Sequence, residues 1–485
     1  MKNSKFLSFL GTLSRKELLA FEQYLLIFHR KEKIALLVFS YLKPFYPKFD
    51  NPAIAFNFAY QEIFGAPLPA DPKAEKKSSK KLLNALSDLF LFLKEFLIIQ
   101  KVKKHPVEKE LLWSRVLLER RKVRAFSTQY PELKKKLKAS SPADVPGYLD
   151  KLAASYIPNY LILQDNSTRS IASLLTFIDD LDCFYASTRL KMACEIATQK
   201  NALALNLPME SAFQAVSLAG VLSPDLKKNN PLIVIYLELF QLIVNKQHES
   251  FEKAELLLRE HTDSIEKQEQ HMIVIHLLNY AAAQIRMGNP GGWSIVHRLN
   301  EYGIKKGLFI EGGLMLPVQF TNIINAACQT KSFKWAQNFV KDYAPYLGEG
   351  IRENNLALGQ AQIAFEQGFY KKTISILKKN AGGDLFYELR VRSLILRSLC
   401  ELRQENGEIQ KYCFAFEQYI YRNKKRNTEA IASVLHFIKI LKVLIFRKKD
   451  KAHLVNEIKT LKPIQFEDWL LRQVEVYYTA APQSR

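Results

Sequence analysis

The sequence predicts an all-α protein, in which an N-terminal helical domain is followed by an irregular α-solenoid of antiparallel helix pairs. Three observations lead to this fold class. The chain has 485 residues, more than the roughly 250 to 300 that one hydrophobic core usually serves. Its 18 Gly and 19 Pro are few for a fold of many short strands and tight turns. Its apolar residues recur at intervals of three and four, the spacing of an amphipathic helix.

The N-terminal domain, predicted over residues 1–140, starts with a local helix signal. Ser14 and Glu17 have the spacing of a capping box, in which each side chain accepts a hydrogen bond from the other residue's backbone N–H. A helix is therefore expected to begin there. Its apolar residues form one stripe: Leu18, Phe21, Leu25 and Phe28.

The most apolar segment, 82–99, is predicted to be a core helix rather than a membrane span. It contains Asp88, Lys94 and Glu95, and each charge would cost about 2.5 to 3.5 kcal/mol in a bilayer. The residues after the first apolar patch do not form a signal-peptide cleavage site. A cytoplasmic protein without a transmembrane segment is expected.

Composition divides the rest of the chain. Residues 139–147, ASSPADVPG, disfavour helix interiors and lack apolar periodicity, which predicts a domain boundary there. Residues 141–230 are predicted to form a helical connecting block, 231–425 the helix-pair repeats, and 426–485 the C-terminal capping helices.

A repeat is visible beyond residue 230. An aromatic residue is followed three positions later by a small or aliphatic residue and usually seven positions later by a larger apolar one, at steps of 42, 40, 37 and 42 residues. Asn300 breaks the second triplet. Each triplet follows an apolar helical stretch, so the unit is helix, turn, helix. The triplets are Phe251/Ala254/Leu258, Trp293/Val296, Phe333/Ala336/Val340, Tyr370/Thr373/Leu377 and Tyr412/Ala415/Tyr419.

This pattern resembles the tetratricopeptide-like superfamily of helical repeats. In that family small residues let the two helices approach and an aromatic packs beside the turn, which implies a stack of hairpins sharing one core. The chain from the Ser14 helix to residues 181–185 also resembles an uncharacterised family of bacterial helical proteins, which implies no function. The superfamily resemblance is clearest at Ala361, Ala364, Gly368, Tyr370, Thr373 and Leu377.

No catalytic, cofactor or metal site is predicted. No glycine leads into a phosphate-binding loop, and the five cysteines are far apart, as expected of buried apolar side chains. His271 and His276 are five apart rather than the four of a helical zinc pair. Asp179 and Asp182 could share a helix face, but a solvated face is the simpler interpretation.

Charge is distributed unevenly. The net charge is +22, and residues 1–140 contribute 28 basic and 13 acidic side chains. Such clusters attract polyanions through counterion release, although basic helix faces also serve solubility. The residues predicted to bind a polyanion are Lys101, Lys103, Lys104, Arg115, Arg120, Arg121, Arg124, Lys134, Lys135, Lys136 and Lys138.

Two functions are compatible with the sequence. The first is a non-catalytic scaffold whose helical-repeat groove binds another protein or a peptide. The alternative is RNA or DNA binding through the basic N-terminal domain. An enzyme is not predicted, because no local pattern of nucleophile, base or metal ligands is present.

Overall fold

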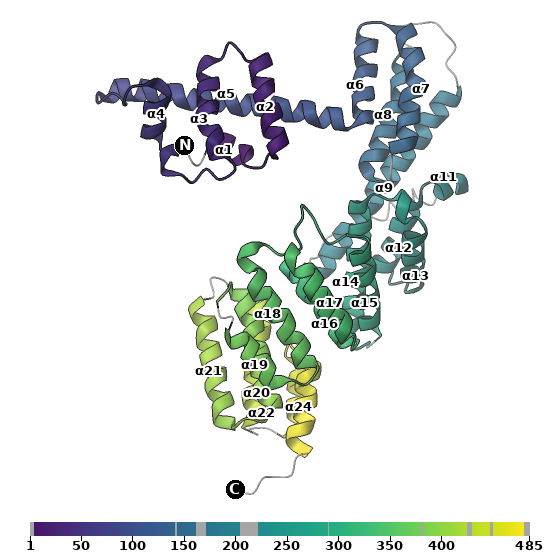
Figure 1. The fold of residues 1–485 in the computed structure, drawn as a ribbon. Helices are drawn as coiled ribbons and strands as arrows, with labels where there is room; N and C mark the ends of the chain where they lie inside the picture. The colour runs from purple at the N-terminus through teal and green to yellow at the C-terminus, as the bar shows by residue number, and fades with distance from the viewer. Residues whose placement is uncertain are drawn as a thin grey trace. The chain divides into compact units, whose positions relative to one another are not determined.

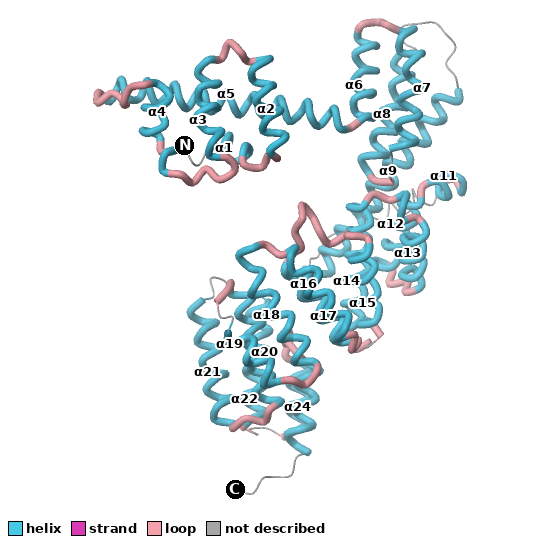
Figure 2. The backbone as a smooth tube through the Cα atoms, viewed as in Figure 1, coloured by secondary structure: helices cyan, strands magenta, loops and turns pink. Residues whose placement is uncertain are grey.

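The computed structural model describes residues 4–140, 143–161, 171–203, 222–289, 291–379, 382–423, 429–446 and 450–479. Across these ranges every regular element is helical, and an isolated β-bridge joins Glu311 and Leu314 (Figure 1, Figure 2). The all-α fold class is confirmed. The chain forms two compact units, Met1–Phe184 and Tyr185–Arg485.

The first unit contains eight complete helices among its described residues and the start of a ninth. They are α1 (Lys5–Leu10), α2 (Arg15–Phe28), α3 (Lys33–Leu42), α4 (Phe56–Phe64), α5 (Pro72–Lys104), α6 (Pro106–Glu119), α7 (Val123–Ser140), α8 (Val145–Leu161) and α9 (Ile171–Leu203), which continues into the second unit.

The second unit continues after α9 with the helices α11 to α24. They are α11 (Pro224–Asn229), α12 (Pro231–Val244), α13 (Glu249–Glu260), α14 (Lys267–Arg286), α15 (Gly292–Lys305), α16 (Pro317–Gln329), α17 (Phe333–Tyr343), α18 (Glu349–Glu366), α19 (Tyr370–Lys379), α20 (Leu385–Glu401), α21 (Asn406–Asn423), α22 (Glu429–Ile445), α23 (Lys451–Thr460) and α24 (Glu467–Thr479).

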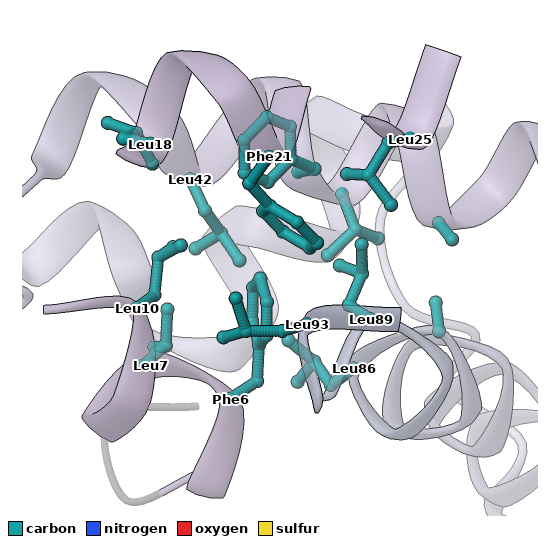
Figure 3. Packing of buried hydrophobic residues seen from close by; sticks show 14 of the residues in the cluster. Phe6, Leu7, Leu10, Leu18, Phe21, Leu25, Leu42, Leu86, Leu89 and Leu93 are labelled. Atoms are coloured by element: carbon teal, nitrogen blue, oxygen red, sulfur yellow. The ribbon is translucent and has the colours of Figure 1, made fainter. Parts of the chain in front are cut away.

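The predicted capping box opens α2. The Glu17 backbone N–H donates to Ser14 Oγ at 3.2 Å, and the Ser14 N–H donates to Glu17 Oε2 at 2.9 Å. Phe21 and Leu25 then enter a core shared by α1, α2, α3 and α5 (Figure 3). Phe28, the last member of the predicted stripe and the last residue of the helix, is instead 68% exposed.

Helix α5 is the long apolar helix of the sequence. It begins at Pro72 because the Asp71 side chain accepts a hydrogen bond from the Ala74 N–H at 2.9 Å. Its buried positions recur along one face from Leu82 to Phe96, and the charged side chain of Lys94 is exposed. Among the described residues, no helix combines the length and apolarity needed to span a membrane.

Helices α6, α7 and α8 share a second core, which crosses the domain boundary predicted at residue 140. The Tyr130 hydroxyl on α7 donates to the Ala154 carbonyl on α8 at 3.1 Å. Leu133 and Ile157 are buried in the same cluster. The polar composition of 139–147 therefore marks the turn between two packed helices, and residues 141 and 142 lie outside the described ranges.

Successive helix pairs of the second unit, from α12–α13 to α20–α21, pack side by side in sequence order (Figure 1). The first helices approach closely: at Gly359 of α18, an added Cβ would lie 2.7 Å from Ile324 Cδ1 of α16. Arg390 of α20 even reaches across to α16, where its Nη1 donates to Thr321 Oγ1 at 2.5 Å. The expectation of hairpins that cover one another is met.

The repeat triplets predict the buried faces of most second helices. Phe251, Ala254 and Leu258 of the first triplet are all buried, whereas Trp293 and Val296 of the second are only half-buried. The fifth triplet is different, because Ala415 is exposed. The buried face of α21 is displaced by one position from the prediction, and consists of Ile409, Cys413, Phe416 and Ile420.

Helices α22, α23 and α24 close the array. They lie within residues 426–485, where capping helices were predicted, and α23 begins at Lys451. Asp450 caps it by accepting from the His453 N–H at 2.8 Å. Trp469 and Leu470 of α24 are buried against the α22 core.

Candidate functional site

A groove of about 620 Å³ lies over α18, between the second helices α17 and α19 of two neighbouring pairs. Its floor is apolar, and six polar or cationic side chains border it. The groove-lining residues are Gln337, Val340, Lys341, Ala344, Pro345, Arg352, Leu356, Gln360, Ile363, Ala364, Gln367, Lys372 and Ile376. Because the first helices approach closely, the open space is on the side of the second helices.

All charged residues in the groove lining are cations: Lys341 on α17, Arg352 on α18 and Lys372 on α19. Arg352 is held in place, because its Nε donates to the Leu347 carbonyl at 3.2 Å and its Nη2 to the Pro345 carbonyl at 3.0 Å. Both Nη1 hydrogens are left without a partner among the described residues. The groove thus offers oriented donors and positive charge beside apolar contact area.

A second groove, of about 510 Å³, lies between α2 and α3 in the first unit. The lysine in its lining, Lys43, forms an ion pair with Glu22 at 2.7 Å. Among the described residues, Arg15 is then the one cation of this lining without a carboxylate beside it, against three cations over α18, which makes the groove over α18 the better candidate for binding a charged partner.

Arg397 of α20 is the most enclosed cation of the described chain. Its guanidinium lies over the rings of Phe365, Phe466 and Trp469, at 4.3, 4.4 and 5.6 Å from their centroids. Burial lowers the pKa of Arg397 to about 10, and the carboxylate of Glu366 lies 3.8 Å from Nη2. Rings on three sides identify this arginine as a contact that joins α24 to the array rather than as a ligand site.

A hydroxyl, an imidazole and a carboxylate also meet between α9 and α14. Thr198 Oγ1 lies 3.1 Å from His276 Nδ1, and Glu195 Oε1 lies 3.4 Å from His276 Nε2. The His276 imidazole beside it lowers the pKa of Glu195. However, Thr198 and Glu195 stand one turn apart on the same helix, and His276 is 2% exposed. This arrangement fixes α9 against α14, and sequence reasoning missed it because the partners are far apart in the chain.

The five cysteines are free and buried, as expected. Burial raises the pKa of Cys183, Cys328 and Cys413 to about 12, which leaves these thiols protonated at neutral pH. Within the described ranges, no group of three or more His, Cys, Asp or Glu could hold a metal ion.

The structure separates the predicted polyanion-binding residues into two groups. Helices α6 and α7 are antiparallel, because Glu110 pairs with Lys136 at 2.7 Å. Arg115, Arg120, Arg121 and Arg124 meet at one end of this hairpin, around the turn between α6 and α7. At the opposite end, near where α6 begins, lie the C-terminal turns of α7. The residues of those turns, and of the end of α5, are Lys101, Lys103, Lys104, Lys134, Lys135, Lys136 and Lys138.

The second group is partly neutralised. Lys136 is paired with Glu110, Lys104 lies 3.5 Å from Glu17, and Lys134 stands over the Tyr130 ring at 4.9 Å. The residues that line the groove over α18 were not singled out from the sequence, since no periodic signal connects Lys341, Arg352 and Lys372.

No family model, curated protein or solved structure matches this chain.

Proposed function

We propose that the protein is a non-catalytic interaction scaffold, whose helical repeats of tetratricopeptide-like type hold a segment of another protein in the groove over α18. The observation that carries this proposal is the lining of the groove, where three cations from three successive helices surround an apolar floor. A segment carrying carboxylates beside apolar side chains complements such a lining.

The chemistry of the groove supports binding rather than catalysis. Its lining contains no Asp, Glu, His or Cys among the described residues, which are the side chains that most often act as general bases or nucleophiles. The glutamines Gln337, Gln360 and Gln367 offer both donors and acceptors to a peptide backbone. A volume of about 620 Å³ accommodates a few side chains of a ligand.

A displayed peptide library, selected against the intact chain, tests the proposal. Wild-type protein is expected to enrich acidic peptides, and the double variant Lys341→Glu/Lys372→Glu is expected to lose them, because it reverses two of the three charges. The matched control is Lys334→Glu/Lys378→Glu, which changes exposed lysines on the same two helices outside the groove. Enriched peptides that bind both double variants equally would show that the groove is not the binding site.

A further inference from the structure

The turn between α6 and α7 carries the strongest uncompensated charge of the hairpin. Residues 115–124 contain five cations and one carboxylate. The cationic tip is defined by Arg115, Arg120, Arg121, Lys122 and Arg124. All five side chains are exposed, and among the described residues none has a carboxylate within 4.0 Å. At the other end of the hairpin, in contrast, Lys136 is paired with Glu110 at 2.7 Å.

The backbone fixes the cationic tip. The Lys122 N–H donates to the Leu117 carbonyl and the Arg121 N–H to the Leu118 carbonyl, both at 2.8 Å. Arg121 has a φ of 54°, a left-handed conformation that usually favours glycine or asparagine. The cations are therefore projected from a tight, hydrogen-bonded turn rather than from a long loop.

The charge is not explained by helix stability alone. Cations at the C-terminus of α6 interact favourably with the helix dipole. Arg124, in contrast, lies in the first turn of α7, which contains no acidic residue, and positive charge is unfavourable at that end of a helix. A stability-driven sequence would place Asp or Glu there, whereas an anionic ligand would benefit from the arginine.

An exposed aromatic ring accompanies the cations. Trp113 is 44% exposed, and its Nε1–H donates to Gln129 Oε1 on α7 at 2.8 Å. This bond orients the indole while part of the ring surface stays accessible. Trp113 lies seven residues before Arg120 on the same helix, a rise of about 10 Å, which a few nucleotides can cover.

We propose that the cationic tip, together with Trp113, binds single-stranded nucleic acid. Four of the five cations are arginines, whose planar guanidinium groups bind phosphate oxygens in pairs. An exposed indole beside them provides a surface on which a base can stack. A lipid headgroup surface is less suitable, because residues 119–124 present no large apolar side chain that could insert and the Trp113 indole is held to Gln129.

The test measures binding of labelled oligouridine and oligothymidine to the full-length chain across a range of salt concentrations. The tip variant is Arg115→Gln/Arg120→Gln/Arg121→Asn/Arg124→Gln, in which Asn suits the left-handed position. It is expected to bind the oligonucleotides at least about tenfold more weakly. The slope of log K against log salt should also become less steep by about 2 to 3, since each lost phosphate contact reduces the magnitude of this slope by about 0.7.

Two further variants separate stacking and general charge from the proposed site. Trp113→Leu is expected to weaken binding about tenfold with an unchanged salt slope, because stacking releases no counterions. The charge control, Lys134→Gln/Lys135→Gln/Lys138→Gln, removes cations from the other end of the hairpin and is expected to change binding less than about twofold.

Three results would overturn the proposal. The first is that the wild-type chain binds neither oligonucleotide at low salt. The second is that the tip variant and the lysine control weaken binding equally, which would indicate diffuse attraction. The third is that anionic phosphatidylserine vesicles or polyglutamate bind the cationic tip as tightly as the oligonucleotides do. None of these results depends on the groove over α18.

Discussion

Tyr236 donates a hydrogen bond of 2.6 Å from its buried hydroxyl to Oε2 of Glu269. Lys191 Nζ contacts the other carboxylate oxygen of Glu269, also at 2.6 Å. Through these bonds, α12 and α9 are both attached to α14, the first helix of the second pair. The pKa of Tyr236 is raised mainly by burial, and further by the neighbouring carboxylate of Glu269.

Removing this carboxylate is expected to destabilise the second unit. Glu269 is 3% exposed, so Glu269→Ala leaves a buried hydroxyl and a half-buried ammonium without their acceptor, at a cost of about 3 to 5 kcal/mol. Glu269→Gln retains an acceptor for Tyr236 and is expected to lose less. Urea unfolding followed by circular dichroism measures both. The exposed Glu260→Ala serves as control, and an equal loss there would contradict the assignment.

Acid sensitivity is expected from Glu195. Its pKa is lowered, chiefly by the nearby His276 imidazole, so its contribution to stability is present above the unfolded pKa of about 4.3. That contribution is lost as the pH falls through the lower, folded value. The difference in urea midpoint between wild type and Glu195→Gln should therefore shrink below about pH 4. If His276→Gln shows the same acid dependence as wild type, this explanation is wrong.

The thiols are expected to be unreactive until the chain unfolds. Burial raises the pKa of Cys183, Cys328 and Cys413 to about 12, and the thiolate is the reactive form. A disulfide reagent at pH 8 should modify none of the five buried cysteines within minutes, and all of them in concentrated urea. Rapid modification of the folded protein would show that a cysteine is accessible.

Two glycines of α18 are expected to respond in opposite directions. Gly359→Val places a branched side chain against Ile324, where a Cβ alone would lie at 2.7 Å, and should cost about 1 to 3 kcal/mol through overpacking. Gly350 has open space around it, so Gly350→Ala should stabilise by up to about 1 kcal/mol. Thermal unfolding compares the two, and equal effects would argue against a close α16–α18 contact.

Sequence reasoning succeeded where the signal is local. The Ser14–Glu17 capping box depends on residues three positions apart, and the Phe251 triplet lies on one face of a short helix. It failed on α21, where the stripe containing Cys413 competes with the adjacent stripe containing Tyr412. Both stripes have helical spacing, and contacts with the neighbouring helices decide which of them is buried.

The binding surfaces required tertiary information. Lys341, Arg352 and Lys372 meet because two second helices stand apart over α18, which no spacing within one helix encodes. The basic residues of the first unit were recognisable from charge alone. Their separation into two groups follows from the antiparallel packing of α6 and α7, which is marked by the ion pair between Glu110 and Lys136.

Because the helix pairs stack in sequence order, a destabilising mutation in one pair should mainly affect the neighbouring pairs. Since the contacts between pairs join mainly pairs that are adjacent in sequence, stability is close to a sum of the contributions of the single pairs and of the interfaces between neighbours. A destabilising mutation in α12–α13 should unfold that end of the array first while α17–α19 remain folded. Protection of the backbone amides from hydrogen exchange would then be lowest at that end and rise gradually along the chain. Such fraying would let the two ends of the array accumulate sequence changes without loss of its middle.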